Sequence, residues 1–127
     1  MIDFNELTPP GTFANDKIDE GANLKEFHEW KCRLAGVTFE GRQKTIKKFA
    51  FPKSKYELVR QPDNQYDENA IMVTVSGHDI GFLPKYLAAE IAPIIDSGQK
   101  LNVQFRRLLV NEKKPDLPAG IIVRVWE

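Results

Sequence analysis

The sequence predicts a mainly β domain with one main helix and one short basic helix. Three observations point to this class. Apolar residues alternate in several short runs, turn residues separate those runs, and a single longer stretch has helical apolar spacing. Six short strands in 127 residues leave many unpaired edges unless the sheet closes or packs on a helix. We therefore expect a small, OB-like six-stranded β-barrel.

The length of the chain fits one domain with its own core. Residues 1–24 are acidic and interrupted by prolines and glycines, which predicts a poorly ordered acidic leader. Residues 25–127 then form the barrel domain. At the junction, Asn23 could cap a short helical turn that runs to Trp30.

The first half of the domain alternates strand and turn patterns. Alternation from Lys31 to Phe39 predicts a strand, and Arg42–Phe49 fits a short basic helix that Pro52 stops. Further strands are expected at Tyr56–Arg60, Ala70–Ser76 and Asp79–Leu83, the last two joined by a tight turn.

The second half contains the main helix. Pro84 suits its first turn, Asp96 to Gly98 end it, and its apolar residues share one side. Those apolar residues are Leu87, Ala88, Ile91, Ile94 and Ile95. Two final strands, Lys100–Val110 and Gly120–Trp126, flank a polar loop.

Charge is balanced overall and uneven along the chain. Eighteen basic and eighteen acidic residues give a net charge of zero, but nine cations face only two acids between Lys31 and Arg60. Such a segment can attract phosphates locally. The alternative is a solvated face that the acidic leader balances.

Few residues suit metal or nucleophilic chemistry. Cys32 is the only cysteine, which excludes an internal disulfide, and with His28 and His78 it leaves a zinc site short of ligands. Neither histidine has a nucleophile beside it in sequence. Asp63 and Asp67 could act as acid and base, although turn aspartates more often bond the local backbone. We expect no catalysis, cofactor or metal.

Two further features narrow the class. The segment Gly36 to Gln43 has glycines at P-loop spacing but lacks the lysine and hydroxyl that hold phosphate and magnesium. No apolar stretch approaches the ~20 residues of a membrane helix, and the N-terminus is acidic. The sequence therefore predicts a cytoplasmic protein with no membrane partner.

Nucleic-acid binding accounts for more of the residues. Single strands are held by aromatic faces and by cations that follow the phosphates. The candidate stacking residues are Tyr66, Phe82 and Tyr86, and the candidate cations are Arg33, Arg42, Arg60 and Lys85. Phe82 has a core alternative, whereas Tyr66 lies in a polar turn. Asp67 beside it would repel phosphate and accept a hydrogen bond from a sugar hydroxyl, which favours a strand terminus with a free hydroxyl.

Three blocks carry a resemblance to a known family. AGVTFEGRQ, RQPDNQYDENAI and IGFLPKYLAAEIAPIIDSG, followed by IIVRVWE, resemble the HIRAN domain in order and spacing. The resemblance implies an OB-like barrel of the stand-alone bacterial or phage kind that binds single-stranded DNA. In helicase-linked members it implies recognition of a free 3′-hydroxyl end at stalled replication forks. It makes Tyr66 a stacking residue, Asp67 the acid on the terminal hydroxyl, Asn64 a polar pocket residue and Lys85 a phosphate contact.

The chain departs from those members at three places. Arg33 or Leu34 stands where they have a second stacking aromatic, Phe82 where they have a histidine, and Leu117 is the counterpart of an apolar wedge. The runner-up function is a protein-interaction module that docks on a repair, replication or phage protein through Arg42–Phe49 or the leader. The ATPase, ligase and zinc functions of large HIRAN-containing proteins belong to other domains.

Overall fold

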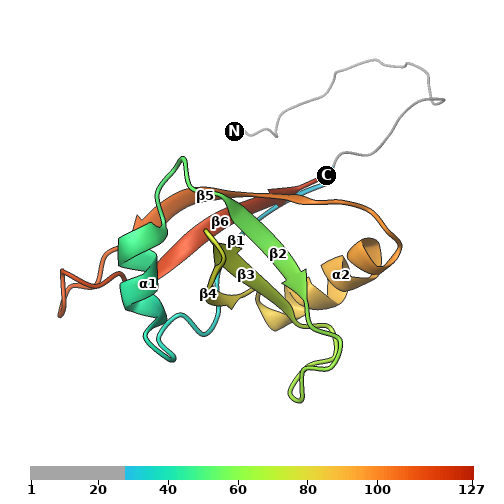
Figure 1. Ribbon diagram of the computed structural model, residues 1–127, viewed down its shortest axis with the longest axis horizontal. Coiled ribbons are helices and arrows are strands. Elements are labelled where there is room, and N and C mark those ends of the chain that lie inside the picture. The colour runs from blue at the N-terminus through green and yellow to red at the C-terminus, as the bar shows by residue number, and fades with distance from the viewer. Residues whose placement is uncertain (1–27) are drawn as a thin grey trace, which may run out of the picture.

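The structure is a computed structural model that describes residues 28–127 (Figure 1). The predicted leader and most of the predicted helical turn lie outside these residues, and Trp30 belongs to a strand. In chain order the elements are β1 (Glu29–Arg33), α1 (Arg42–Phe49), β2 (Tyr56–Arg60), β3 (Ile71–Val75), β4 (His78–Phe82), α2 (Lys85–Asp96), β5 (Asn102–Leu109) and β6 (Gly120–Trp126).

The strands form two antiparallel sheets of three strands each, ordered β1-β6-β5 and β2-β3-β4. The mainly β fold with two helices is thus confirmed, whereas the closed barrel is not. Strands β2 and β5 are the sheet edges that face each other, and Figure 1 shows them diverging from a close approach at one end. There the rings of Tyr56 and Phe105 lie 6.4 Å apart. Because the twisted strands cross at an angle, their backbones do not form a continuous ladder.

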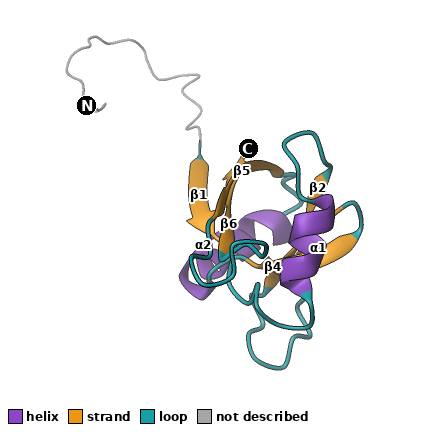
Figure 2. Cartoon of the chain, turned by 90° about the vertical axis from the view of Figure 1, so that its left-hand side faces the viewer, coloured by secondary structure: helices purple, strands orange, loops and turns teal. Residues whose placement is uncertain are grey.

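The core lies between the sheets and against both helices. Strand β6 alternates as expected, with Ile121, Val123 and Val125 fully buried, and β3 contributes Val73 and Val75. Burying each such side chain contributes about 1.5–3 kcal/mol. The helices α1 and α2 lie at opposite ends of the molecule, so that α1 is in front of α2 in Figure 2.

Both helices lie where the sequence predicts them, whereas the first strand begins and ends earlier than predicted. Strand β1 spans only Glu29–Arg33, because the chain turns at Gly36, where φ is +72°. The guanidinium of Arg42 donates to the Gly36 carbonyl oxygen at 2.9 Å and holds that turn. A glycine takes this backbone conformation without steric cost, so the alternating pattern beyond Leu34 does not continue as a strand.

Candidate nucleic-acid interface

A pocket of about 310 Å³ lies where the β2–β3 loop, the end of β4 and the first turn of α2 meet. Five predicted DNA-binding residues converge there from separate parts of the chain. Its lining consists of Ala35, Asn64, Tyr66, Asp67, Ala70, Phe82, Leu83 and Lys85. A loop, a strand end and a helix start therefore build one concave surface.

Side-chain caps hold the β2–β3 loop in shape. The Asn64 side-chain oxygen accepts hydrogen bonds from the backbone N–H groups of Tyr66 and Asp67, at 2.9 and 3.1 Å. The Asn64 amide nitrogen donates to the Gln61 side-chain oxygen at 3.0 Å. One Asp67 oxygen accepts from the backbone N–H of Asn69 at 2.9 Å. These bonds are the local kind that Asn and Asp make in turns, so Asn64 positions the two residues that follow it.

The aromatic residues of the pocket differ in exposure. Tyr66 is 83% exposed on the loop, and Phe82 is half-buried. The backbone of Phe82 is fixed by paired hydrogen bonds with Ala35, at 2.8 and 2.9 Å. The pocket therefore has one ring in solvent and a second that β4 holds in place.

Opposite charges meet at this pocket. Asp67 is half-buried, and only its Oδ1 has a hydrogen-bond donor among residues 28–127, which leaves Oδ2 able to accept another. Lys85 is exposed at the start of α2, and its ammonium makes no ion pair within the described chain. The pocket therefore offers a hydrogen-bond acceptor and a cation to one ligand.

Arg60 lies outside the pocket lining and makes a dense set of contacts. Its guanidinium forms two hydrogen bonds of 3.0 Å with the Asp96 carboxylate at the end of α2. It also donates to the carbonyl oxygens of Glu68 and Ala70, at 2.8 and 3.2 Å. These contacts connect the β2–β3 loop to α2, so Arg60 has a structural role.

We expect Arg60→Gln to lower the free energy of unfolding by about 1.5–3 kcal/mol, because it removes charge-assisted hydrogen bonds. Urea denaturation measures the change. Asp96→Asn is the matched partner for a double-mutant cycle and should show coupling with Arg60→Gln. Full stability of the Arg60→Gln protein would contradict the structural role.

Arg42 and Arg33 also lie away from the pocket lining. The Arg42 side chain is buried, bonds Asp79 at 3.1 Å, and has its guanidinium carbon 5.3 Å from the centroid of the Phe82 ring. It therefore supports Phe82. Arg33 is exposed on β1 and donates to the Ala119 carbonyl oxygen at 3.1 Å.

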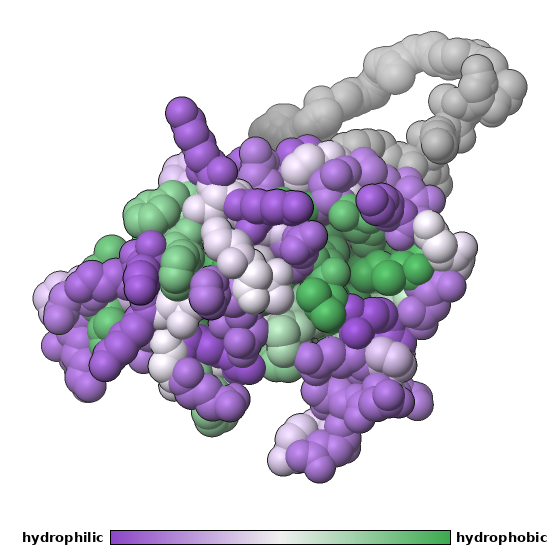
Figure 3. Space-filling view, viewed as in Figure 1, coloured by the Kyte–Doolittle hydropathy of each residue, from purple (hydrophilic) through white to green (hydrophobic). Residues whose placement is uncertain are grey.

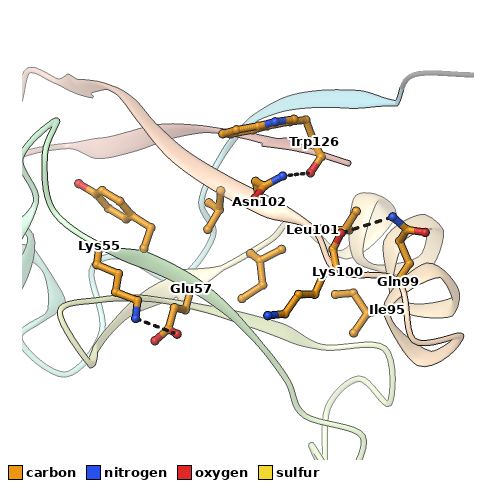
Figure 4. A pocket seen from close by; sticks show the side chains of 11 residues that line it. Lys55, Glu57, Ile95, Gln99, Lys100, Leu101, Asn102 and Trp126 are labelled. Atoms are coloured by element: carbon orange, nitrogen blue, oxygen red, sulfur yellow. Dashed lines mark hydrogen bonds and ion pairs between the residues drawn. The ribbon is translucent and has the colours of Figure 1, made fainter.

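A larger groove of about 520 Å³ follows the open seam between β2 and β5. Figure 3 shows apolar surface in a hollow of the molecule, and Figure 4 shows the groove-lining side chains, among them Leu101 and Ile95. Lys55 and Glu57 form an ion pair of 3.9 Å at its rim. No pattern in the sequence indicates this groove, because its lining comes from elements that only the fold brings together.

Within residues 28–127, no three His, Cys, Asp or Glu side chains are grouped as metal ligands would be. Burial raises the pKa of the Cys32 thiol to about 11, so this group stays protonated and unreactive at neutral pH. No helix in that part of the chain is long and apolar enough to cross a membrane.

Comparison with known proteins identifies the family. The HIRAN domain family model matches residues 30–121. The chain belongs to the HIRAN family. Its sequence is 51% identical over 100 residues to the helicase-like transcription factor of Oryctolagus cuniculus, covering 76% of this chain and 9% of that protein. This HIRAN domain thus corresponds to a small part of its curated relative.

Comparison with solved structures supports the fold in one case. A Lactobacillus plantarum protein has a TM-score of 0.56 at 20% identity, covering 80% of this HIRAN chain and 100% of that one. An NMR structure of the HLTF HIRAN domain in its DNA-bound conformation has a TM-score of 0.46 at 20% identity, covering 77% and 74%. The first likeness shows a shared fold and says nothing of a ligand.

Proposed function

We propose that this HIRAN domain is a DNA-binding module that holds single-stranded DNA by a free 3′-hydroxyl end. The observation that carries the proposal is the pocket itself, which unites the exposed Tyr66 ring, the Asp67 carboxylate and the Lys85 ammonium. The module would serve DNA repair or replication-fork processing inside the cell, without a catalytic reaction of its own.

Each group has a distinct task in this proposal. A terminal base stacks on Tyr66, whose ring is free, while Phe82 forms an apolar wall. The free Oδ2 of Asp67 accepts a hydrogen bond from the terminal hydroxyl and repels a terminal phosphate, since two anions would meet there. Lys85 attracts a phosphate of the preceding nucleotide.

Family membership supports DNA as the ligand, because the HIRAN domain of HLTF has been solved in a DNA-bound conformation. The chain spans only 9% of the helicase-like transcription factor, so the proposal covers binding alone. We further propose that the domain works as a stand-alone module of residues 25–127, with residues 1–24 as an acidic leader.

Asp67→Asn tests the end recognition. The substitution keeps an oxygen for the Asn69 N–H but removes the negative charge. We expect the preference for a 3′-hydroxyl over a 3′-phosphate end to shrink about tenfold. The reason is that the substitution weakens one charge-assisted hydrogen bond to the hydroxyl and removes one repulsion of the phosphate. Fluorescence anisotropy with the two matched oligonucleotides measures the ratio.

Asp63→Asn is the control, because Asp63 lies in the same loop and does not line the pocket. It removes the same charge and should leave the ratio unchanged. An unaltered ratio in a folded Asp67→Asn protein removes Asp67 from the hydroxyl role.

A second candidate function is protein interaction, and the open seam favours it. Among the described residues, β2 pairs only with β3 and β5 only with β6, which leaves two strand edges beside a groove lined by both apolar and polar side chains. An extended peptide can add to such an edge. Salt separates the two functions: phosphate contacts weaken steeply with ionic strength, and apolar docking does not. A repair, replication or phage protein would be the partner.

A further inference from the structure

The exposed face of the β1-β6-β5 sheet carries rows of cations. Residues directly opposite in an antiparallel pair point to the same side of the sheet. Cys32 and Val123 are opposite each other and buried, so their neighbours point outward. The outward rows are Arg33, Ile122 and Arg107 in one, and Lys31, Arg124 and Gln104 in the next.

Most of this positive charge is not neutralised within residues 28–127. Lys31 and Arg107 are exposed and form no ion pair there. Arg33 donates only to a neutral carbonyl oxygen. The acid of the next outward row, Glu29, is paired with Arg124, whose guanidinium carbon lies 4.1 Å from the Trp126 ring centroid. A net positive surface therefore remains.

The cations are close enough to act together. Lys31 and Arg33 are two residues apart on one strand, about 7 Å, and Arg107 lies two strands from Arg33, about 10 Å. These spacings are near the screening length of about 8 Å at physiological salt, so their fields add. Gly120 leaves room for the Arg33 side chain, since a Cβ at position 120 would come within 2.9 Å of the Arg33 Nε atom.

Ala35 links this face to the pocket along the chain. Ala35 lines the pocket, is bonded to Phe82 and is exposed, as are Arg33 and Lys31 earlier in the same alternation. A single-stranded DNA whose 3′ end lies at Asp67 can therefore pass Ala35 and continue over Arg33 and Lys31.

We propose that this sheet face is a phosphate-binding path for the DNA strand that leads to the pocket. The inference rests on the proposed function of the pocket and adds the direction of the strand. The 3′-terminal nucleotide lies at Tyr66 and Asp67. Nucleotides on its 5′ side cross β1 toward β5, with their phosphates near Lys31, Arg33 and Arg107.

The test compares oligothymidylates of three and twelve nucleotides, each with a free 3′-hydroxyl. The double variant Lys31→Gln/Arg107→Gln should lose on the order of tenfold affinity for the longer one and flatten its salt slope by about 1.4, at about 0.7 per phosphate contact. Its affinity for the trinucleotide, followed by NMR titration, should match that of the wild-type protein.

The control variant Lys53→Gln/Lys100→Gln removes the same charge from exposed positions outside this face. It should bind both oligothymidylates with the affinity of the wild-type protein. Wild-type affinity of the Lys31→Gln/Arg107→Gln protein for the longer strand, with trinucleotide binding intact, would overturn the path alone. Absence of trinucleotide binding by the wild-type protein would overturn the pocket proposal, and with it the path that begins there.

Discussion

Replacing Tyr66 by alanine is expected to weaken binding of short single-stranded DNA by about 5- to 150-fold. Stacking of one base on an aromatic ring contributes about 1–3 kcal/mol, and every 1.4 kcal/mol is tenfold in affinity. Tyr66 is 83% exposed, so removal of its ring should leave the thermal midpoint of the domain unchanged. Fluorescence anisotropy gives the affinity, and circular dichroism confirms the fold.

Tyr86→Ala is the matched control. Tyr86 is 74% exposed and lies one residue beyond Lys85, but it does not line the pocket. It should retain nearly all of the affinity. If the two variants bind equally well, the stacking role of Tyr66 is wrong.

Gly81→Ala is expected to destabilise the domain by about 2–4 kcal/mol, through overpacking and backbone strain together. Gly81 has φ of +151°, and a Cβ there would lie 2.7 Å from the Ala35 carbonyl oxygen. That oxygen accepts the Phe82 N–H bond at 2.9 Å, so the substitution also displaces a wall of the pocket. Thermal unfolding should show a midpoint lower by about 10 °C or more.

Gly77→Ala separates the two causes. Gly77 also has positive φ, +84°, but a Cβ there meets no atom within 4 Å. It should cost only the backbone strain, about 1 kcal/mol. Equal losses from the two substitutions would show that the approach of β4 to Ala35 is not a tight contact.

Local signals made much of the fold predictable from the sequence. Pro84 marks the start of α2 and Pro52 follows α1, and both helices lie where the sequence predicts them. The end of β1 was missed, because the alternating pattern continues through a turn that depends on Gly36 and on a contact from Arg42. The barrel prediction was wrong in its closure, since pairing of β2 with β5 depends on how two twisted sheets meet.

The candidate site divides in the same way. Asn64, Tyr66 and Asp67 lie within four consecutive positions of one loop, so their proximity could be read directly from the sequence. The roles of the arginines could not be predicted from the sequence, because the partners of Arg60 and Arg42 are 36 and 37 residues away. A basic residue chosen by charge alone can be a structural ion pair. The cation rows of the β1-β6-β5 sheet required the strand register.

The most direct test of the central claim is binding of one short single-stranded DNA with either a free or a phosphorylated 3′ end, at low and moderate salt. The pocket around Tyr66 and Asp67 predicts tighter binding of the free hydroxyl at both salts, with affinity for both ends falling as salt rises. Equal affinity for the two ends would contradict 3′-end recognition, and absence of binding at low salt would favour the protein-interaction function instead.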